Sequence, residues 1–176
     1  KGLKAITEEQ IEEATIKVVM GTEKKSHVIS DKDKMITSYH EAGHAIVSYF
    51  LPTQDPVHQI SIIPRGMAAG YTMYLPDEEK FCDTREELQA ELHSLLGGMA
   101  AERVVFATTT TGVSNDLQRA TSLARSMVAQ YGMSDELGLM APSANKSQYL
   151  EGQSYLSCSD GTSAKVDNAV QTLLSN

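Results

Sequence analysis

The sequence is poor in cysteine and in positive charge, and it has no long apolar run. The two cysteines, Cys82 and Cys158, lie far apart without CxxC spacing, which excludes a disulfide framework and a thiolate zinc knuckle and favours a reducing compartment. With 23 acidic and 15 basic residues the net charge is -8, so nucleic acid or an anionic lipid surface is disfavoured as a partner. No run of about 18 apolar residues and no hydrophobic signal core occur. We therefore expect a soluble chain, and 176 residues suit one domain with a substantial core.

The patterning that is present is mainly helical. Capping signals and apolar periodicity predict helices over about 7–21, 30–51, 84–106 and 114–131, with a further helix from 162 to the end. We expect Ser114 to cap the fourth helix, whose apolar stripe includes Leu117 and Tyr131, and Gly132 to close it. Runs rich in β-forming residues over 57–64 and 70–76 predict two short strands. The expected fold class is mainly α, with a small β-sheet beside the second helix.

The second helix carries the sequence His-Glu-Ala-Gly-His from His40 to His44. Residues four apart differ in direction by about 40°, so the two imidazoles can bind one ion. Glu41 is rotated by about 100° and can reach a water molecule beside that ion, which is the arrangement of HExxH zinc peptidases. The alternative is that both histidines are hydrogen-bonded at the edge of the core. We predict that the histidines lie at the edge of a core-facing stripe of apolar and small residues. That stripe consists of Ile36, Tyr39, Gly43, Ile46, Val47 and Phe50.

Gly43 and the residues that follow it carry two further indications. A glycine inside a helix costs about 1 kcal/mol relative to alanine, so Gly43 indicates that another backbone or a further metal ligand approaches closely. Val47 and Phe50 stand where a metzincin has glycine and histidine, which excludes that class.

A catalytic zinc needs a third protein ligand and one open position. The candidates in this sequence are His27, His58, His93, Glu102 and Asp116. The three histidines are more simply explained as surface or structural residues. Glu102 continues an apolar stripe, where a carboxylate needs a partner: a metal, the free N–H of a ligating histidine, or Arg103. Asp116 lies in the first turn of its helix, either as a ligand or as an acid that stabilises the helix dipole. Position alone leaves both acids open.

Several ordered blocks of this sequence resemble a known family. The segments "ITEEQIEEATIKVVMG", "HEAGHAIVSYFLP", "ISIIPRGMAAGYTMYLP", "GGMAAERVVF" and "TTGVSNDLQRATSLARSMVAQYGMSDELG" together resemble the proteolytic domain of the FtsH-type proteases, which are ATP-dependent, membrane-anchored zinc peptidases. The resemblance covers about residues 6–139.

The resemblance implies a zincin-like helical protease domain with one Zn²⁺ per chain. It implies that His40, His44 and Asp116 are the zinc ligands and Glu41 is the catalytic base. Glu102 then supports a ligating histidine. Gly70, Tyr71 and Thr72 belong to an edge strand, against which an extended substrate would pair.

The resemblance also implies an organisation for the parent protein. Residues 1–22 would be the end of an AAA+ lid helix, 23–34 a linker and the start of the HExxH helix, and 35–176 the peptidase domain, with a truncated C-terminus. The fold from about residue 143 onward is left open. ATP and the membrane would enter only through an AAA+ module and transmembrane segments that this sequence does not contain.

The implied function is hydrolysis of unfolded or translocated polypeptides within a homo-hexamer. The parent would lie in the bacterial inner membrane with this domain facing the cytoplasm, or in an organellar membrane. Two alternatives remain at this stage: a non-catalytic oligomerisation scaffold with a vestigial metal site, and a stand-alone zinc peptidase of another family.

Overall fold

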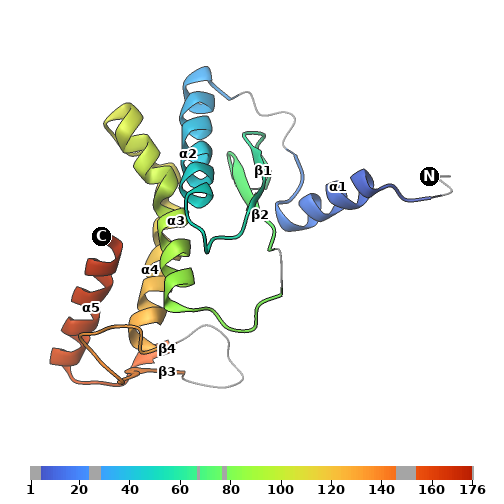
Figure 1. The fold of residues 1–176 in the computed structure, drawn as a ribbon. Coiled ribbons are helices and arrows are strands. Elements are labelled where there is room, and N and C mark those ends of the chain that lie inside the picture. The colour runs from blue at the N-terminus through green and yellow to red at the C-terminus, as the bar shows by residue number, and fades with distance from the viewer. Residues whose placement is uncertain (1–4, 24–28, 67, 77–78, 146–153, 176) are drawn as a thin grey trace.

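The computed structural model describes residues 5–23, 29–66, 68–76, 79–145 and 154–175 (Figure 1). Its helices are α1 (Glu8–Val19), α2 (Asp31–Tyr49), α3 (Arg85–Phe106), the short 3-10 helix η1 (Thr111–Val113), α4 (Ser114–Ala129) and α5 (Asp160–Ser175). Its strands are β1 (Val57–Ser61), β2 (Tyr71–Tyr74), β3 (Ser143–Asn145) and β4 (Ser154–Leu156). The predicted fold class, mainly α with a small sheet beside the HExxH helix, is confirmed.

Helices α2 and α3 run antiparallel and form the centre of the fold (Figure 1). They cross at Gly43 and Gly97, where a Cβ atom added to Gly97 would lie 2.8 Å from the carbonyl oxygen of Gly43, and one added to Gly43 would clash with the carbonyl oxygen of Gly97. Only two glycines allow so close an approach. The close backbone contact that Gly43 predicts is therefore present, and α3 provides it.

The buried face of α2 is polar, which corrects the predicted apolar stripe. The buried residues are His40, Glu41, Gly43, His44 and Ser48. Ile46 is 59% exposed and Phe50 76%, and Tyr39 is also exposed. The prediction was wrong because apolar periodicity assumes that buried positions need apolar side chains, whereas α3, β2 and α4 supply hydrogen-bond partners for the polar ones.

The β1–β2 hairpin packs beside α2. The strands are antiparallel, with Ile60 opposite Thr72, and the register shifts between Val57 and Gln59. Both strands are shorter than predicted. In the region for which the sequence predicted no fold, β3 and β4 form a second antiparallel pair.

The main apolar core lies among α3, α4 and α5. Its most buried members include Leu92, Ala120, Ala124, Met127, Val128 and Val166. By contrast, Ile16 is the one buried residue of α1, and Figure 1 shows this helix extending away from the body of the molecule.

The predicted helix caps are partly correct. Capping boxes are present at Thr7 and Thr84. Ser114 is not a cap, because α4 continues directly from η1, whose own cap is Thr110. Helix α4 also ends before Gly132, and the expected stripe residues Leu117 and Tyr131 are exposed. No helix in the described part of the chain is long and apolar enough to cross a bilayer.

Candidate metal centre

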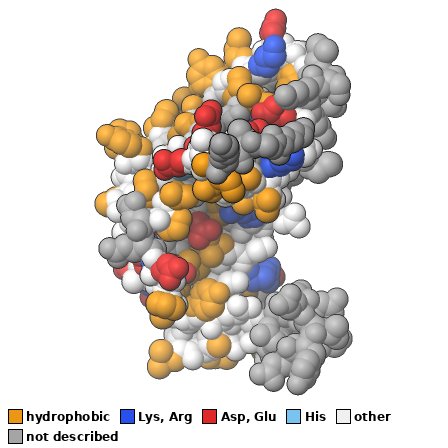
Figure 2. All heavy atoms as spheres, turned by 90° about the vertical axis from the view of Figure 1, so that its right-hand side faces the viewer, with side chains coloured by type: hydrophobic (Ala, Val, Ile, Leu, Met, Phe, Trp, Pro, Cys, Tyr) orange, Lys and Arg blue, Asp and Glu red, His pale blue; other side chains and the backbone are white. Residues whose placement is uncertain are grey.

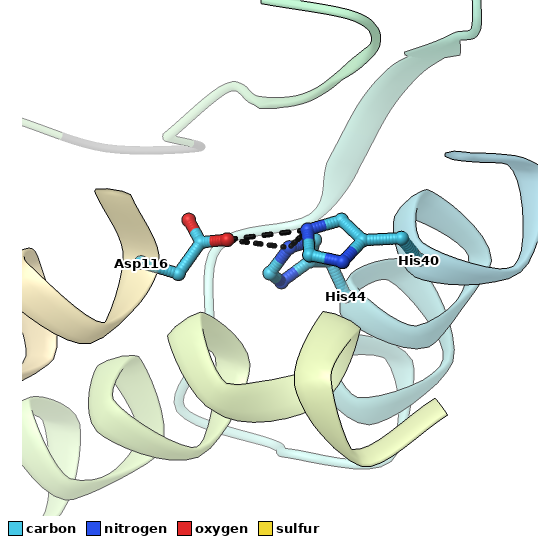
Figure 3. A group of neighbouring side chains, drawn as sticks. All are labelled: His40, His44 and Asp116. Carbon is cyan, nitrogen blue, oxygen red and sulfur yellow. Dashed lines mark hydrogen bonds and ion pairs between the residues drawn. The ribbon is translucent and has the colours of Figure 1, made fainter. Parts of the chain in front are cut away.

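Three side chains from two helices converge on one point (Figure 3). His40 and His44 lie one turn apart on the buried face of α2, and their Nε2 atoms are 3.1 Å apart. Asp116 reaches them from the first turn of α4: its Oδ2 is 3.2 Å from Nε2 of His40 and 3.5 Å from Nε2 of His44. The three ligand atoms therefore form a compact triangle.

Helix α3 fixes the orientation of both imidazole rings. Nδ1 of His44 lies 2.7 Å from the carbonyl oxygen of Ser94, which can only accept, so Nδ1 carries the proton. Nδ1 of His40 lies 2.9 Å from Oε1 of Glu102 and donates to that carboxylate. When a ring is neutral, its lone pair is then on Nε2, where a metal ion can bind. When the ring is protonated, Nε2–H can donate to the carboxylate of Asp116 instead.

This donor set fits a zinc ion. Two imidazole nitrogens and a carboxylate oxygen face one another, so a cation between them removes the repulsion of their lone pairs. A tetrahedral zinc with bonds of roughly 2.0–2.2 Å places its ligand atoms about 3.3 Å apart, close to the distances found here. Gly98 of α3 leaves room beside the imidazoles, because a Cβ atom at that position would lie 2.6 Å from Nε2 of both His40 and His44.

The electrostatics of the three side chains are coupled. Burial lowers the pKa of His40, but hydrogen bonds to Asp116 and Glu102 outweigh it, and the pKa of His40 is raised. Burial alone would raise the pKa of Asp116, whereas its hydrogen bonds to His40 and His44 hold that pKa well below its usual range. Asp116 is therefore an anion throughout the neutral pH range, as a carboxylate ligand must be.

Glu41 lies next to this triangle but contacts a different element. Its side chain is only 6% exposed, and its Oε2 accepts a hydrogen bond of 2.8 Å from Oγ1 of Thr72 in β2. Burial raises the pKa of Glu41, while Thr72 and the two histidines pull it down. Glu41, the histidines and Asp116 line one cleft of about 1020 Å³, which is large enough for several residues of a peptide.

Comparison with known proteins identifies the family. Residues 27–176 match the model of Peptidase family M41, a match that covers most of the chain. The chain belongs to peptidase family M41.

Several relatives of this M41 chain share a printed name. The chain is 44% identical over 177 residues to the "ATP-dependent zinc metalloprotease FtsH" of Caldicellulosiruptor bescii, covering 99% of this chain and 29% of that protein. A protein of the same name from Thermotoga maritima is 46% identical over 180 residues, covering 100% of this chain and 30% of its own length. The protein of that name from Rubrobacter xylanophilus is 54% identical over 144 residues, which cover 82% of this chain and 22% of that protein. The chain thus spans less than a third of the length of these relatives.

The remaining candidate ligands of the M41 chain lie elsewhere. Glu102 is 1% exposed and contacts Nδ1 of His40, on the side of the ring away from the point where the three ligand atoms meet. The carboxylate of Glu102 also accepts hydrogen bonds from the backbone N–H and the hydroxyl of Thr110. His58 pairs with Glu12 on the surface and His93 is exposed. His27 lies outside the described residues.

Some residues of the site had no signal in the sequence. The carbonyl of Ser94 orients His44, but any residue type has a carbonyl, so no pattern could reveal it. The hydroxyls of Ser48, Ser94 and Tyr74 hydrogen-bond to one another behind His44. Gly98 could have been noticed, because a glycine pair within a helix is unfavourable unless space is needed.

Proposed function

We propose that this chain is the zinc-dependent endopeptidase module of an ATP-dependent, membrane-anchored protease. The observation that carries the proposal is the convergence of His40 Nε2, His44 Nε2 and Asp116 Oδ2 on one point, with Glu41 lining the same cleft. The relatives' printed name, which combines ATP dependence, zinc and proteolysis, supports it.

In this proposal His40, His44 and Asp116 hold the zinc ion through the atoms described above. The ion supplies Lewis-acid polarisation of the scissile carbonyl and makes water more acidic. Glu41 accepts the proton of the attacking water on its carboxylate and then delivers it to the leaving amine. The position of Glu41 in the same cleft as the three proposed ligands supports both steps.

The substrate lies along β2. This strand pairs with β1 on one side, and no other described strand pairs with it; Gly70 and Thr72 line the cleft. An extended polypeptide can add to that edge through backbone hydrogen bonds, which is a sequence-tolerant way to bind unfolded chains. Tyr71 contributes differently: its side chain is buried and its hydroxyl donates to Gln59.

The domain organisation and the assembly of the parent protein are proposed from the similarity to these relatives. Residues 1–22 are the end of an AAA+ lid, 23–34 are the linker and the start of the HExxH helix, and 35–176 are the peptidase domain. The parent protein is a homo-hexamer in the bacterial inner membrane with this domain on the cytoplasmic side, where ATP-driven translocation feeds in unfolded protein substrates.

Two variants test this function against the alternative of a scaffold with a vestigial site. We expect one zinc per wild-type chain and chelator-sensitive hydrolysis of an unfolded protein such as casein. Glu41→Gln should keep the zinc and lose at least about 100-fold in rate, whereas His44→Ala should lose both zinc and hydrolysis. Wild-type rates in Glu41→Gln would remove Glu41 from the mechanism, and a zinc-loaded wild type without hydrolysis would favour the scaffold.

A further inference from the structure

The two carboxylate oxygens of Glu41 lie against two residues at the start of β2: Thr72, within the strand, and Gly70, just before it. Its Oε2 receives the hydroxyl of Thr72 at 2.8 Å, and the same hydroxyl lies 3.2 Å from the carbonyl oxygen of Glu41. A hydroxyl has one proton, so the shorter contact to the charged oxygen dominates. The other oxygen, Oε1, lies against Gly70, where an added Cβ atom would be 2.9 Å away.

Thr72 is well suited to hold a flexible acid. A glutamate side chain has three rotatable bonds, and this one would lose its orientation without a fixed partner. Threonine is β-branched, so its χ1 angle is stiff, and it sits in a strand whose backbone is fixed by pairing with Ile60. The hydroxyl is therefore already in place before the metal or a substrate arrives.

We propose that Thr72 is a positioning residue, which holds the Glu41 carboxylate so that Oε1 is the oxygen that accepts the proton of the attacking water. The inference rests on the proposed function, in which Glu41 is the base. The hydroxyl of Thr72 occupies Oε2, and Oε1, next to the side-chain-free Gly70, keeps its lone pairs. Because Thr72 belongs to the strand that pairs with substrate, one element sets the positions of both the base and the scissile bond.

Tyr74 provides a control that distinguishes positioning of Glu41 by Thr72 from simple anchoring of the strand. It lies two residues along β2 on the same face of the strand and anchors the hairpin to the helices through its hydroxyl, 3.1 Å from Oγ of Ser48 on α2 and 3.0 Å from Oγ of Ser94 on α3. Thr72 and Tyr74 are thus two hydroxyl anchors of one strand, and only Thr72 contacts Glu41. Removing the hydroxyl of Tyr74 loosens the strand without removing the partner of the base.

The test compares Thr72→Val, which keeps the shape and removes the hydroxyl, with Thr72→Ser, which keeps the hydroxyl. In the zinc-loaded protein acting on an unfolded substrate, we expect Thr72→Val to keep zinc stoichiometry and KM and to lower kcat by roughly 10- to 100-fold, the effect of a misplaced catalytic group. Thr72→Ser should restore most of kcat. In crystals of the metal-free protein, the Glu41 carboxylate of Thr72→Val should leave its wild-type position.

Tyr74→Phe and Glu41→Gln are measured beside these variants. A wild-type kcat in Thr72→Val, together with an inactive Glu41→Gln, would overturn the inference and leave the proposed function standing. A loss of kcat in Tyr74→Phe as large as that in Thr72→Val, with zinc stoichiometry unchanged in both variants, would overturn it too, since a loosened strand would then explain both. An active Glu41→Gln would instead overturn the proposed function.

Discussion

Replacing Gly98 by alanine should abolish tight zinc binding without unfolding the protein. Gly98 lies on the face of α3 that covers the two imidazoles, and its backbone has ordinary helical angles. In a helix, alanine is favoured over glycine by about 1 kcal/mol. The substitution therefore adds helix propensity and perturbs only the space beside the ligands.

The expected magnitude follows from the contacts of the added methyl group. Its carbon would lie 2.6 Å from Nε2 of both histidines, whereas non-bonded atoms of this size rest about 3.5–4.0 Å apart. The rings must therefore move by about 1 Å, and zinc sites tolerate displacements of only about 0.2 Å in their bonds. The rings cannot move freely, because Ser94 and Glu102 hold their Nδ1 atoms. We expect zinc affinity to fall at least about 100-fold, which is about 2.7 kcal/mol.

Competition with a coloured zinc chelator measures this affinity, and urea unfolding of the metal-free protein measures stability. Gly161→Ala is the matched control, since a Cβ atom at Gly161, in the first turn of α5, would meet no atom within 4 Å. Gly98→Ala should remain folded and bind zinc weakly, whereas Gly161→Ala should bind like the wild type. If Gly98→Ala held zinc with wild-type affinity, the ion would not lie between these two imidazoles, and the assigned centre would be wrong.

Three further predictions concern the surroundings of the site. Glu102→Gln should weaken zinc binding by roughly 10- to 100-fold, as loss of a carboxylate behind a ligating histidine does, and the same competition assay would show an unchanged affinity if Glu102 were only structural. Gly43→Ala should lower the free energy of unfolding of the metal-free protein by about 1–3 kcal/mol in urea, because the methyl group would force α2 and α3 apart; a stability equal to wild type would contradict the close crossing. Met127→Ala, in the fully buried core, should cost about 2–5 kcal/mol with little change in the zinc affinity of the refolded protein, and a large loss of affinity would show that core and site are coupled.

The parts of the fold that sequence could predict are those specified by local chemistry. The spacing of His40 and His44 places two ring nitrogens on one side of a helix whatever surrounds it. The capping boxes at Thr7 and Thr84 satisfy backbone groups within four residues. Asp116 is different: its position in the first turn of its helix suited two roles equally, and only the approach of α4 to α2 places it beside the imidazoles.

The parts that sequence could not predict depend on partners from distant segments. A sequence predicts an amphipathic helix when its apolar side chains share one face, and that face is expected to be buried. On α2 this rule predicted that Ile46 and Phe50 face the core, but both are exposed. The rule failed because burial of His40 and Ser48 is compensated by groups on α3 and β2 that no local pattern announces.

The glycines at the helix crossing connect the packing of this fold to its chemistry. The partners of the two imidazoles, the carbonyl of Ser94 and the carboxylate of Glu102, are both on α3 and eight residues apart, so they flank the crossing on either side. Side chains at the crossing would hold α3 further from α2, and both hydrogen bonds would then lengthen together. The small residues of α2 and α3 thus determine which nitrogen of each ring carries its proton. The helix crossing prepares two Nε2 lone pairs for a metal ion before any ion binds.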